Sequence, residues 1–498
     1  MDNNIGKNGV PIELIEYNGD LEVGPALLSL GKKNTSPTVS GKEGISQSGD
    51  SNLIERIKDI IAGSREFICL SSYLIQNSII IEEIKKCAKR NVRVYIMTAA
   101  ENRVENPDED DTSSIAEIKK ASRELLVQLA SVAHIKSGEN LHSKFILSDP
   151  KTDPKGMVFT SNLTKRALEE NIELAIELSK DEVLELFRQF VSGFWKLAVR
   201  TLYPSINSPN YLRVLKPHPE FISGHYTPKN IKWTIGEECL IRDKLLEIIE
   251  SAKESISVSA WTIDATHPVS RKIIEKAKNG ISVTIFSRPH PSNAAFMGEI
   301  VNLGGKVYCH ELLHAKSLIV DGKHGVIMTA NISKLGLDEG FETAVILNKK
   351  QVEVIKRIHE EWKKRVSFES FKHLKLKEAK SPRLDLSKNL TELSPPGEYL
   401  EIKIKSPIVA NTIDDYRFKK FEFTQSRYNT KYLRIKYKGV LLPPTLPKGS
   451  KRSPDASKYS LGVFISNGKN YVCIRDLSEL EEARNISGKI DAKIVFNA

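Results

Sequence analysis

The stretch "ENLHSKFILSD" (residues 139–149) spaces a histidine, a lysine and an aspartate as H-x-K-x4-D. Side chains two residues apart on an extended strand share a face, so His142 and Lys144 point the same way and Asp149 points to the opposite side. The same spacing returns downstream in "ELLHAKSLIVD" (residues 311–321), at His314, Lys316 and Asp321. One such triplet is common by chance, whereas two copies in one chain need an explanation.

Matching residues follow both triplets. The first copy continues as "MVFTSNLTKRALEENIE" (157–173) and the second as "VIMTANISKLGLDEGFE" (326–342). Each segment holds a threonine, an asparagine two residues later and a glutamate eleven residues after that: Thr160, Asn162 and Glu173, then Thr329, Asn331 and Glu342. The same residue types in the same order make a solvated strand edge a poor explanation for this set.

The surrounding sequence is duplicated as well. "DIIAGSREFICLSSYLI" from Asp59 aligns without a gap with "EIIESAKESISVSAWTI" from Glu247, an offset of 188 residues. Both copies alternate helical and short apolar strand patterns, which predicts a mainly parallel sheet with helices on both faces. The repeat is far too long for a solenoid, so it indicates two copies of an α/β/α sandwich domain related by a pseudo-twofold axis.

Changes in composition suggest five segments. They are an N-terminal extension (1–50), a first α/β domain (51–203), a linker rich in Pro, Ser and Asn (204–235), a second α/β domain (236–366) and a β-rich domain (367–498). The last segment contains short runs of β-branched and aromatic residues separated by turn residues. We therefore expect an α/β protein with a C-terminal, mainly β accessory domain.

The paired motifs suit chemistry on a phosphodiester. If the two copies face each other, one cleft holds two imidazoles, two ammonium groups, two carboxamides and two carboxylates. Lysine and asparagine side chains donate hydrogen bonds to non-bridging phosphate oxygens, whose charge must be held through the transition state. One histidine attacks phosphorus and the other protonates the leaving oxygen. A glutamate that accepts the second ring N–H fixes the tautomer of the imidazole.

These residues resemble the phospholipase D superfamily, which is marked by two HKD motifs. The resemblance extends from about Leu53 to Val366 and implies a phosphohistidine intermediate with neither metal nor other cofactor. It implies that His142 and His314 are nucleophile and general acid, in an order left open. It further implies that the lysines and asparagines bind phosphate, that the glutamates orient the histidines, and that Asp149 and Asp321 are structural.

Two positions depart from the family pattern. The first copy has three more residues between its aspartate and asparagine, which reads as a longer turn. Where the family has Gly-Ser before the asparagine, this chain has "TSN" and "TAN". The hydroxyl of Thr160 or Thr329 is therefore a candidate phosphate contact, provided that its side chain faces the cleft.

The positive charge is concentrated at the C-terminal end. The chain has a formal charge of +11, and residues 367–498 hold 25 Lys and Arg against 15 Asp and Glu. A basic strand face with interleaved aromatic residues is a candidate surface for a phosphate backbone. The residues predicted to form it are Arg427, Lys431, Arg434, Lys436, Lys438, Lys448, Lys451 and Arg452. A solubilising or protein-docking face is the alternative.

The sequence-based hypothesis is a metal-independent nuclease, cleaving DNA or RNA in restriction or phage defence. The alternatives are a phospholipase or phosphatidyltransferase acting on lipid, and a non-catalytic nucleic-acid-binding scaffold. With no secretory signal region and no apolar run of about 18 residues, we expect a cytoplasmic protein with a nucleic-acid partner and no membrane partner. Five scattered cysteines give neither a disulfide framework nor a zinc site. The oligomeric state stays open, and a dimer is possible.

Overall fold

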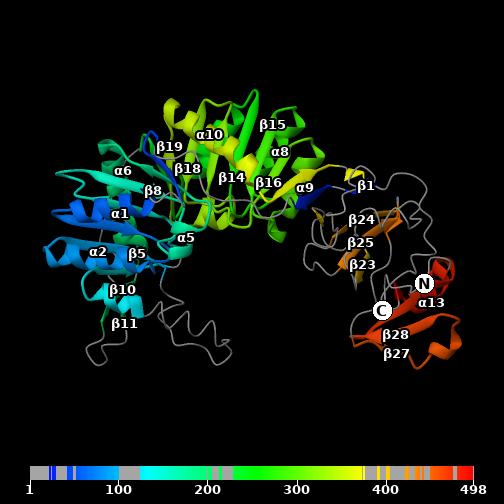
Figure 1. Cartoon of the computed structure of the whole chain (residues 1–498). Coiled ribbons are helices and arrows are strands. Elements are labelled where there is room, and N and C mark those ends of the chain that lie inside the picture. Colours follow the sequence, from blue (N-terminus) through cyan, green and yellow to red (C-terminus); the bar gives the residue numbers. More distant parts are fainter. Residues whose placement is uncertain are drawn as a thin grey trace. The chain divides into compact units, whose positions relative to one another are not determined.

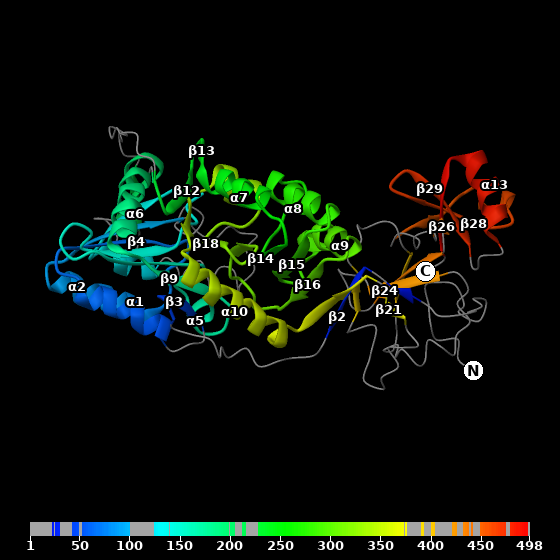
Figure 2. The same ribbon diagram turned by 90° about the horizontal axis from the view of Figure 1, so that it is seen from above.

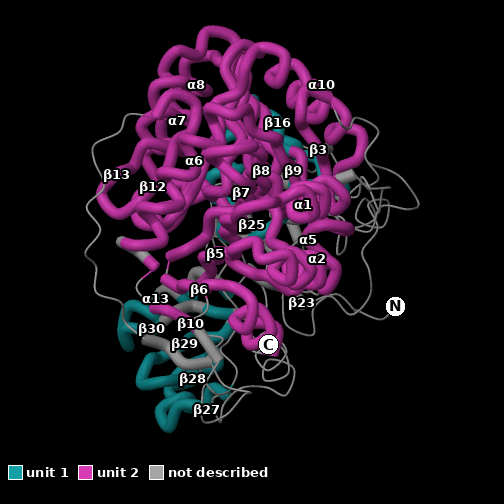
Figure 3. The backbone as a smooth tube through the Cα atoms, turned by 90° about the vertical axis from the view of Figure 1, so that its left-hand side faces the viewer, with its two compact units in different colours: residues 1–32, 289–307, 367–498 teal, residues 33–288, 308–366 magenta. Residues whose placement is uncertain are grey.

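The computed structural model describes most of the duplicated region and parts of both termini. The described residues are 22–23, 25–29, 42–48, 52–99, 124–138, 140–198, 200–204, 212–215, 228–372, 374–375, 390–392, 400–403, 421–425, 432–437, 440–441, 449–474 and 479–496. They fall into two compact units (Figure 3). Unit 2, which contains both motifs, comprises residues 33–288 and 308–366, and unit 1 comprises residues 1–32, 289–307 and 367–498.

The first repeat is built on a nine-stranded sheet of order β11-β10-β6-β5-β4-β7-β8-β9-β3 (Figure 1). The strands are β3 (Ile45–Gln47), β4 (Phe67–Ser71), β5 (Arg93–Thr98), β6 (His134–Ser137), β7 (Phe145–Ser148), β8 (Lys155–Phe159), β9 (Leu174–Glu177), β10 (Arg200–Pro204) and β11 (Leu212–Leu215). Its central strands are buried along most of their length, because helices cover both faces.

The second repeat has the corresponding sheet, with the order β13-β12-β19-β18-β17-β14-β15-β16. The strands are β12 (Ile231–Ile235), β13 (Glu238–Cys239), β14 (Ser255–Ser259), β15 (Ser282–Ser287), β16 (Lys306–Cys309), β17 (Ser317–Val320), β18 (His324–Met328) and β19 (Glu342–Ile346). The central order β5-β4-β7-β8-β9 thus recurs as β15-β14-β17-β18-β19. The duplication seen in the sequence is a duplication of topology, and both repeats are phospholipase D-like α/β domains.

Helices cover each sheet on both faces (Figure 2). In the first repeat α1 (Asn52–Gly63) and α2 (Ser78–Lys89) lie on one face and α6 (Lys180–Ser192) on the other. In the second repeat α7 (Leu240–Glu250) and α8 (Pro268–Lys278) lie opposite α10 (Lys349–Arg365). Capping boxes, Ser179 with Glu182 and Asn348 with Gln351, fix the N-terminal ends of α6 and α10. Shorter helical turns are α5 (Lys165–Glu169), η2 (Gly193–Leu197) and η4 (Leu335–Glu339).

The prediction of a mainly parallel sheet is wrong. Strand β5 pairs in parallel with β4 and β6, as helical crossovers require, but β4 pairs with β7 in the antiparallel sense. The strands β7, β8, β9 and β3 then continue antiparallel. After each H-x-K motif the first connection is short, with residues 149–154 joining β7 to β8 and residues 321–323 joining β17 to β18, too few for the crossover that a parallel pair needs. Each motif therefore begins the antiparallel part of a mixed sheet.

Two boundaries drawn from the sequence also differ from the structure. Strand β3 lies within the predicted N-terminal extension, yet it is the edge strand next to β9. Strands β11 and β12 lie within the predicted linker, and each pairs with a sheet. Short strands inside segments rich in Pro and Asn show little strand pattern in the sequence, because their structure depends on pairing with a neighbouring strand. Residues 289–307, drawn as part of the second repeat, group with unit 1.

Unit 1 consists mainly of short strands. It contains β1 (Glu22–Val23), β2 (Ala26–Ser29), η3 (Pro291–Asn293), α9 (Ala294–Asn302), β20 (Phe368–Phe371), β21 (Leu374–Lys375), β22 (Leu390–Glu392), β23 (Leu400–Lys403), β24 (Phe421–Gln425), β25 (Tyr432–Tyr437), β26 (Val440–Leu441), β27 (Lys451–Arg452), η5 (Ala456–Lys458), β28 (Gly462–Ser466), β29 (Lys469–Ile474), α13 (Leu480–Ile490) and β30 (Ala492–Phe496). The turn of the β28–β29 hairpin is Asn467-Gly468, both at positive φ as this turn requires. The helix α13, which connects the parallel pair β29 and β30, was not anticipated.

The aspartate of each motif follows one strand of the sheet and accepts hydrogen bonds from the backbone at the start of a neighbouring strand. Asp149 accepts N–H groups from Arg65, Glu66 and Phe67 at 2.7, 2.8 and 2.9 Å. In the second repeat Asp321 accepts N–H groups from residues 253–255 in the same way, at 2.8 to 2.9 Å. Both aspartates sit at positive φ, 44° and 52°, which Asp tolerates better than most residues. They hold the start of β4 and β14 against the adjacent hairpin, away from the histidines.

We expect Asp149→Ala to lower the free energy of unfolding by about 2–4 kcal/mol, because three backbone donors lose a charged acceptor. Asp149→Asn keeps one acceptor oxygen and tolerates positive φ, so its loss should be smaller. Urea denaturation followed by tryptophan fluorescence measures both. An Asp149→Ala protein as stable as the parent would show that these hydrogen bonds do not hold the sheet.

Candidate active site

The two motifs meet along a backbone seam between the repeats. His142 donates its N–H to the carbonyl of Phe341 at 3.1 Å, and His314 donates its N–H to the carbonyl of Ile172 at 2.9 Å. Isolated parallel bridges join Leu141 to Phe341 and Ile172 to Leu313. The two sets of contacts are counterparts under the duplication, so the seam has the pseudo-twofold symmetry that the sequence predicted. It places each histidine beside the glutamate-bearing strand of the other repeat.

The histidine–glutamate pairs are crossed between the repeats. Nδ1 of His142, from the first repeat, lies 2.7 Å from Oε1 of Glu342 in the second. Nδ1 of His314, from the second repeat, lies 2.8 Å from Oε1 of Glu173 in the first. A carboxylate only accepts hydrogen bonds, so each Nδ1 carries the proton and each Nε2 keeps its lone pair. The sequence predicted a glutamate behind each histidine but gave no indication that each pair crosses the seam.

The threonines support the glutamates. The hydroxyl of Thr160 donates to Oε2 of Glu173 at 2.6 Å, and Thr329 donates to Oε2 of Glu342. Both threonines are fully buried, and each hydroxyl also accepts a backbone N–H. The predicted contact of these hydroxyls with phosphate is therefore not supported, because the hydroxyls are already engaged. Each carboxylate has one oxygen held by a threonine and the other left for an imidazole.

Burial lowers the pKa of both lysines. Lys144 and Lys316 are both 0 % exposed, and each ammonium group donates to the backbone carbonyl of the histidine two residues before it. Burial, with a smaller contribution from the other lysine, lowers the pKa of Lys144 to about 7. Burial lowers the pKa of Lys316 to about 8. The cleft therefore holds two buried lysines whose pKa values lie close to neutral pH, even though Glu173 and Glu342 act to raise them.

Burial also affects the pKa values of the two histidines and of the two glutamates that face them. It lowers the pKa of His314 to about 4 and also lowers that of His142, although the facing carboxylates act in the opposite direction. For Glu173 and Glu342 burial acts to raise the pKa, but the neighbouring imidazoles and lysines outweigh it and leave the pKa lowered. Near neutral pH the site thus has ionised glutamates and neutral histidines.

Each asparagine follows the buried threonine of its repeat by two residues. The side-chain oxygen of Asn162 is buried without a hydrogen-bond partner among the described residues. Its counterpart Asn331 accepts the N–H of Thr262 at 3.4 Å. Since the two oxygens are acceptors, the amide N–H groups are left as donors for a ligand.

Aromatic rings flank both histidines. The ring centroid of Tyr73 lies 5.6 Å from that of His142, and the ring centroid of Trp261 lies 5.6 Å from that of His314. The two positions align in the duplication, and Tyr73 is 38 % exposed. The sequence placed these rings at the rim of the cleft with core packing as the default, and the structure places them against the imidazoles.

Arg288 was missed by the sequence reasoning. Its guanidinium donates to the carbonyl of Leu313 at 2.7 Å and lies 6.0 Å from the centre of the Trp261 ring. Its counterpart in the first repeat is Ala99, so the repeat that identified the other residues gives no signal here. Arg288 adds a positive charge to the His314 side of the cleft alone.

The predicted nucleic-acid surface cannot be assembled from the described residues. Lys451 and Arg452 are exposed on β27, and Arg434 and Lys436 lie in β25. The other four, Arg427, Lys431, Lys438 and Lys448, lie outside the described residues. In the part of the chain that the structure describes, no three His, Cys, Asp or Glu side chains are grouped to hold a metal ion, and no helix is long and apolar enough to cross a bilayer.

Comparison with known proteins identifies the family. The family model described as "Cardiolipin synthase, PLD-like domain" matches residues 57–195 and 245–366, together just over half of the chain. Cardiolipin synthase A of Erwinia tasmaniensis is 28% identical over 152 residues, which cover 27% of this chain and 31% of the relative. Cardiolipin synthase A of Yersinia pseudotuberculosis is 28% identical over 120 residues, covering 22% and 25%. The match thus spans about a third or less of these relatives.

Solved structures also resemble this chain at low sequence identity. A phosphatidylserine synthase of Haemophilus influenzae has a TM-score of 0.49 at 12% identity, covering 72% of this chain and 93% of that one. The phospholipase D family member Nuc of Salmonella typhimurium has a TM-score of 0.25 at 23% identity, covering 28% and 97%.

These findings correct the functional hypothesis. The nuclease prediction and its nucleic-acid partner are wrong, because the family model and the curated relatives carry the names of enzymes that make a phospholipid. The expectation of no membrane partner is overturned on the same ground, since cardiolipin is a lipid. The HKD motifs define phosphodiester chemistry without choosing its substrate, and the basic C-terminal segment misled that choice. The chain belongs to the cardiolipin synthase-type, phospholipase D-like domain family within the phospholipase D superfamily.

Proposed function

We propose that this protein cleaves the phosphodiester of a phospholipid and transfers the phosphatidyl group to an alcohol or to water. The observation that carries the proposal is the pair of crossed His–Glu contacts, at 2.7 and 2.8 Å, which gives one cleft two equally oriented imidazoles. The family match supports a lipid as the substrate. Substrate, activity and partners of the whole protein remain part of the proposal.

In the first step, Nε2 of one histidine attacks phosphorus and forms an N–P bond. The other histidine enters this step as the imidazolium, a form that the bound phosphodiester anion and the facing glutamate favour. The bond from phosphorus to the head-group oxygen breaks, and that oxygen takes the Nε2 proton of this imidazolium. The glutamate behind each ring stabilises the imidazolium form and keeps Nδ1 protonated. The products are an alcohol and a phosphatidyl group bound to histidine. Because the two halves are pseudo-symmetric, either His142 or His314 is suited to attack.

In the second step, an acceptor alcohol or water attacks phosphorus while the second histidine removes its proton. The N–P bond breaks, and both histidines return to their starting states. The same arrangement therefore serves hydrolysis and transfer, and the acceptor decides between them. Exclusion of water from the acceptor position favours transfer.

The lysines and asparagines hold the phosphate. The ammonium groups of Lys144 and Lys316 are buried beside the histidines, and the amide donors of Asn162 and Asn331 complete the proposed phosphate-binding set. A phosphodiester anion brought into this site meets two cations that are otherwise unfavourably buried. Binding therefore favours the charged form of both lysines and stabilises the extra negative charge of the transition state.

The aromatic rim of the cleft supports a lipid as the substrate. Tyr73 and Trp261 flank the two histidines, so the approach to each imidazole is partly apolar. Aromatic rings with a polar edge are suited to the boundary between acyl chains and head groups.

We expect the full chain, in EDTA, to release the head group of at least one of phosphatidylcholine, phosphatidylethanolamine and phosphatidylglycerol presented in detergent micelles. With an added alcohol it should form the transferred phosphatidyl product, measured by mass spectrometry. His142→Ala and His314→Ala should each lower the rate by at least about a thousandfold. Glu173→Gln and Glu342→Gln should lower it less, because the imidazole remains.

The matched control is His324→Ala, since His324 is an exposed histidine on β18 outside the cleft. Its rate should equal that of the parent. Plasmid DNA offered in parallel tests the substrate class. Cleavage of DNA with all three lipids intact would overturn the proposal, and so would lipid cleavage that survives both cleft-histidine substitutions.

We also expect sulfate, an anion that does not titrate between about pH 5 and pH 9, to bind more weakly as pH rises. The bound anion favours the ammonium form, so affinity is full below the pKa of the free lysines. It should fall as pH passes about 7 for Lys144 and about 8 for Lys316. The slope approaches about tenfold per pH unit for each neutral lysine. The inhibition constant of sulfate as a competitive inhibitor, measured from about pH 5 to pH 9, gives this dependence of affinity on pH.

Lys144→Met serves as the internal control, since it removes one of the two titrations. Its sulfate affinity should be lower at acidic pH and should lose the decline near pH 7, while the decline near pH 8 remains. A parent whose sulfate affinity is flat over the whole range would show that the lysines do not bind the anion.

A further inference from the structure

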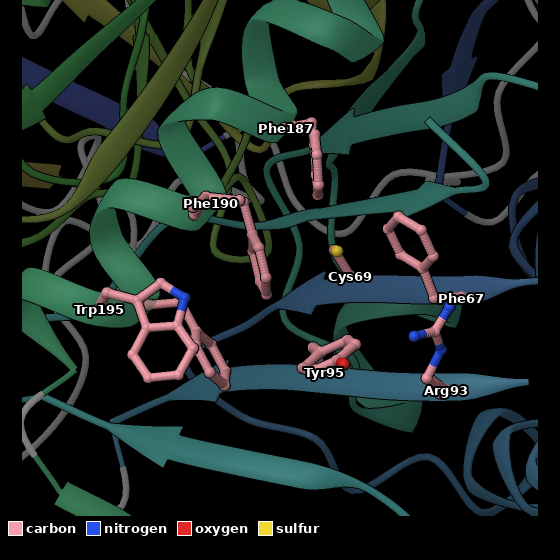
Figure 4. A pocket seen from close by; sticks show the side chains of 9 residues that line it. Phe67, Cys69, Arg93, Tyr95, Phe187, Phe190 and Trp195 are labelled. Carbon is pink, nitrogen blue, oxygen red and sulfur yellow. The ribbon is translucent and has the colours of Figure 1, made fainter. Parts of the chain in front are cut away.

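The first repeat contains a cavity that the chemistry does not use. It has a volume of about 210 Å³ and lies between the sheet and α6 (Figure 4). We call it the aromatic hollow, and its lining residues are Phe67, Cys69, Arg93, Tyr95, Phe187, Phe190, Val191, Phe194 and Trp195. Phe67 and Arg93 are the first residues of β4 and β5, whereas His142 and Lys144 come just before Phe145, which pairs with Ser71 at the other end of β4. The hollow is thus separate from the cleft.

The lining is apolar and rigid. Phe67 and Tyr95 pack edge to face with centroids 6.5 Å apart, and Phe190 and Phe194 stack at 5.4 Å. Cys69 lies on the sheet side, and burial raises the pKa of its thiol, so it behaves as a small apolar side chain there. Such a surface gains free energy by taking an apolar group out of water.

The charges around the hollow are positive. Arg93 lines it and is exposed, and its guanidinium makes no ion pair or hydrogen bond with the described residues. The guanidinium lies 5.8 Å from the centre of the Phe67 ring. Nζ of Lys136 lies 4.1 Å from the ring centre of Trp195 and 5.0 Å from that of Phe194. This lysine is only 5 % exposed, and its ammonium group has no hydrogen-bond partner among the described residues.

The second repeat fills the corresponding space. Ser257, which aligns with Cys69, hydrogen-bonds to Nδ1 of His359 at 2.8 Å. The other ring nitrogen of His359 bonds to Ser317 at 2.9 Å, and the ring packs 5.1 Å from that of Trp362. A satisfied polar contact therefore stands where the first repeat keeps an open aromatic surface. The hollow is a feature of one repeat and does not follow from the fold alone.

We propose that the aromatic hollow binds a fatty-acid anion, with the alkyl chain among the aromatic rings and the carboxylate at Arg93. An aromatic cage also suits a quaternary ammonium group, but Arg93 and Lys136 repel a cation. The volume exceeds the roughly 150 Å³ of an engineered cavity that holds a benzene molecule, so several methylene groups fit. This site is independent of the proposed catalysis.

The test compares three ligands with the same ten-carbon chain, decanoate, decanol and decyltrimethylammonium, by titration calorimetry below their micelle concentrations. We expect affinity to fall in that order. Within the carboxylates from hexanoate to dodecanoate, affinity should rise by about fourfold per methylene until the hollow is full. Tightest binding of decyltrimethylammonium, or no saturable binding of any of the three, would overturn the proposal.

Arg93→Met should weaken decanoate binding by about tenfold and leave decanol unchanged, which removes the preference for the anion. Lys89→Met is the matched control, because Lys89 is an exposed cation on α2, on the other face of the sheet. An equal effect of both substitutions would contradict the assignment of the carboxylate to Arg93.

Val191→Trp should fill the hollow and abolish binding of all carboxylates. Leu184→Trp is its control, since Leu184 is exposed on the same helix and does not line the hollow. His142→Ala and His314→Ala, which disable the cleft, should leave decanoate binding unchanged. Loss of decanoate binding in the cleft variants would place the ligand in the cleft and refute the proposal, whether or not the protein cleaves lipid.

Discussion

The arrangement of this protein depends on two hydrogen bonds that cross between its repeats. Glu173 of the first repeat holds His314 of the second, and Glu342 of the second holds His142 of the first. The side chains of both glutamates are almost fully buried, so each carboxylate needs its partner. Removing one partner from a buried charged pair costs about 3–5 kcal/mol. Neither repeat thus contains a complete histidine–glutamate pair, and the proposed mechanism requires the two repeats to stay associated.

The backbone hydrogen bonds of the seam position each histidine against the glutamate of the other repeat. The N–H of each histidine is bonded to a carbonyl one residue before the glutamate that its side chain meets. Main chain and side chain of the histidine are therefore fixed by the same strand of the other repeat. Thr160 and Thr329 then hold the second oxygen of each carboxylate. A site built in this way is positioned before substrate arrives, which lowers the reorganisation needed in the transition state.

The sequence predicted the members of this site because duplication made them visible. Residues that occur in both repeats, such as Asn162 and Asn331, were found by spacing alone. Arg288 was not found, since its counterpart is an alanine. The crossing of the pairs was also beyond prediction, because spacing along the chain does not show which copy supplies the partner. The role of the threonines depends on side-chain direction, which a motif does not encode.

The main error of the sequence-based hypothesis was to infer the substrate from the net charge of the C-terminal segment. The basic surplus of residues 367–498 is a statement about solubility and electrostatic attraction, and it does not identify a substrate. A phosphodiester anion is common to nucleic acids and phospholipids, so the motifs agree with both. Only the relationship of the repeats to a named family separates them.

The repeats have diverged most where α6 and α10 cover their sheets. Fourteen residues after its N-cap, α6 gives way to the π-helix η2 at Gly193, whereas α10 has Trp362 at that position. A Cβ at Gly193 would lie 2.6 Å from a ring carbon of Phe341, the residue whose carbonyl holds His142. Glycine is therefore required there, and the wider π turn carries Phe194 and Trp195 to the edge of the hollow. The π turn thus accompanies both the close approach of Gly193 to Phe341 and the aromatic lining of the hollow.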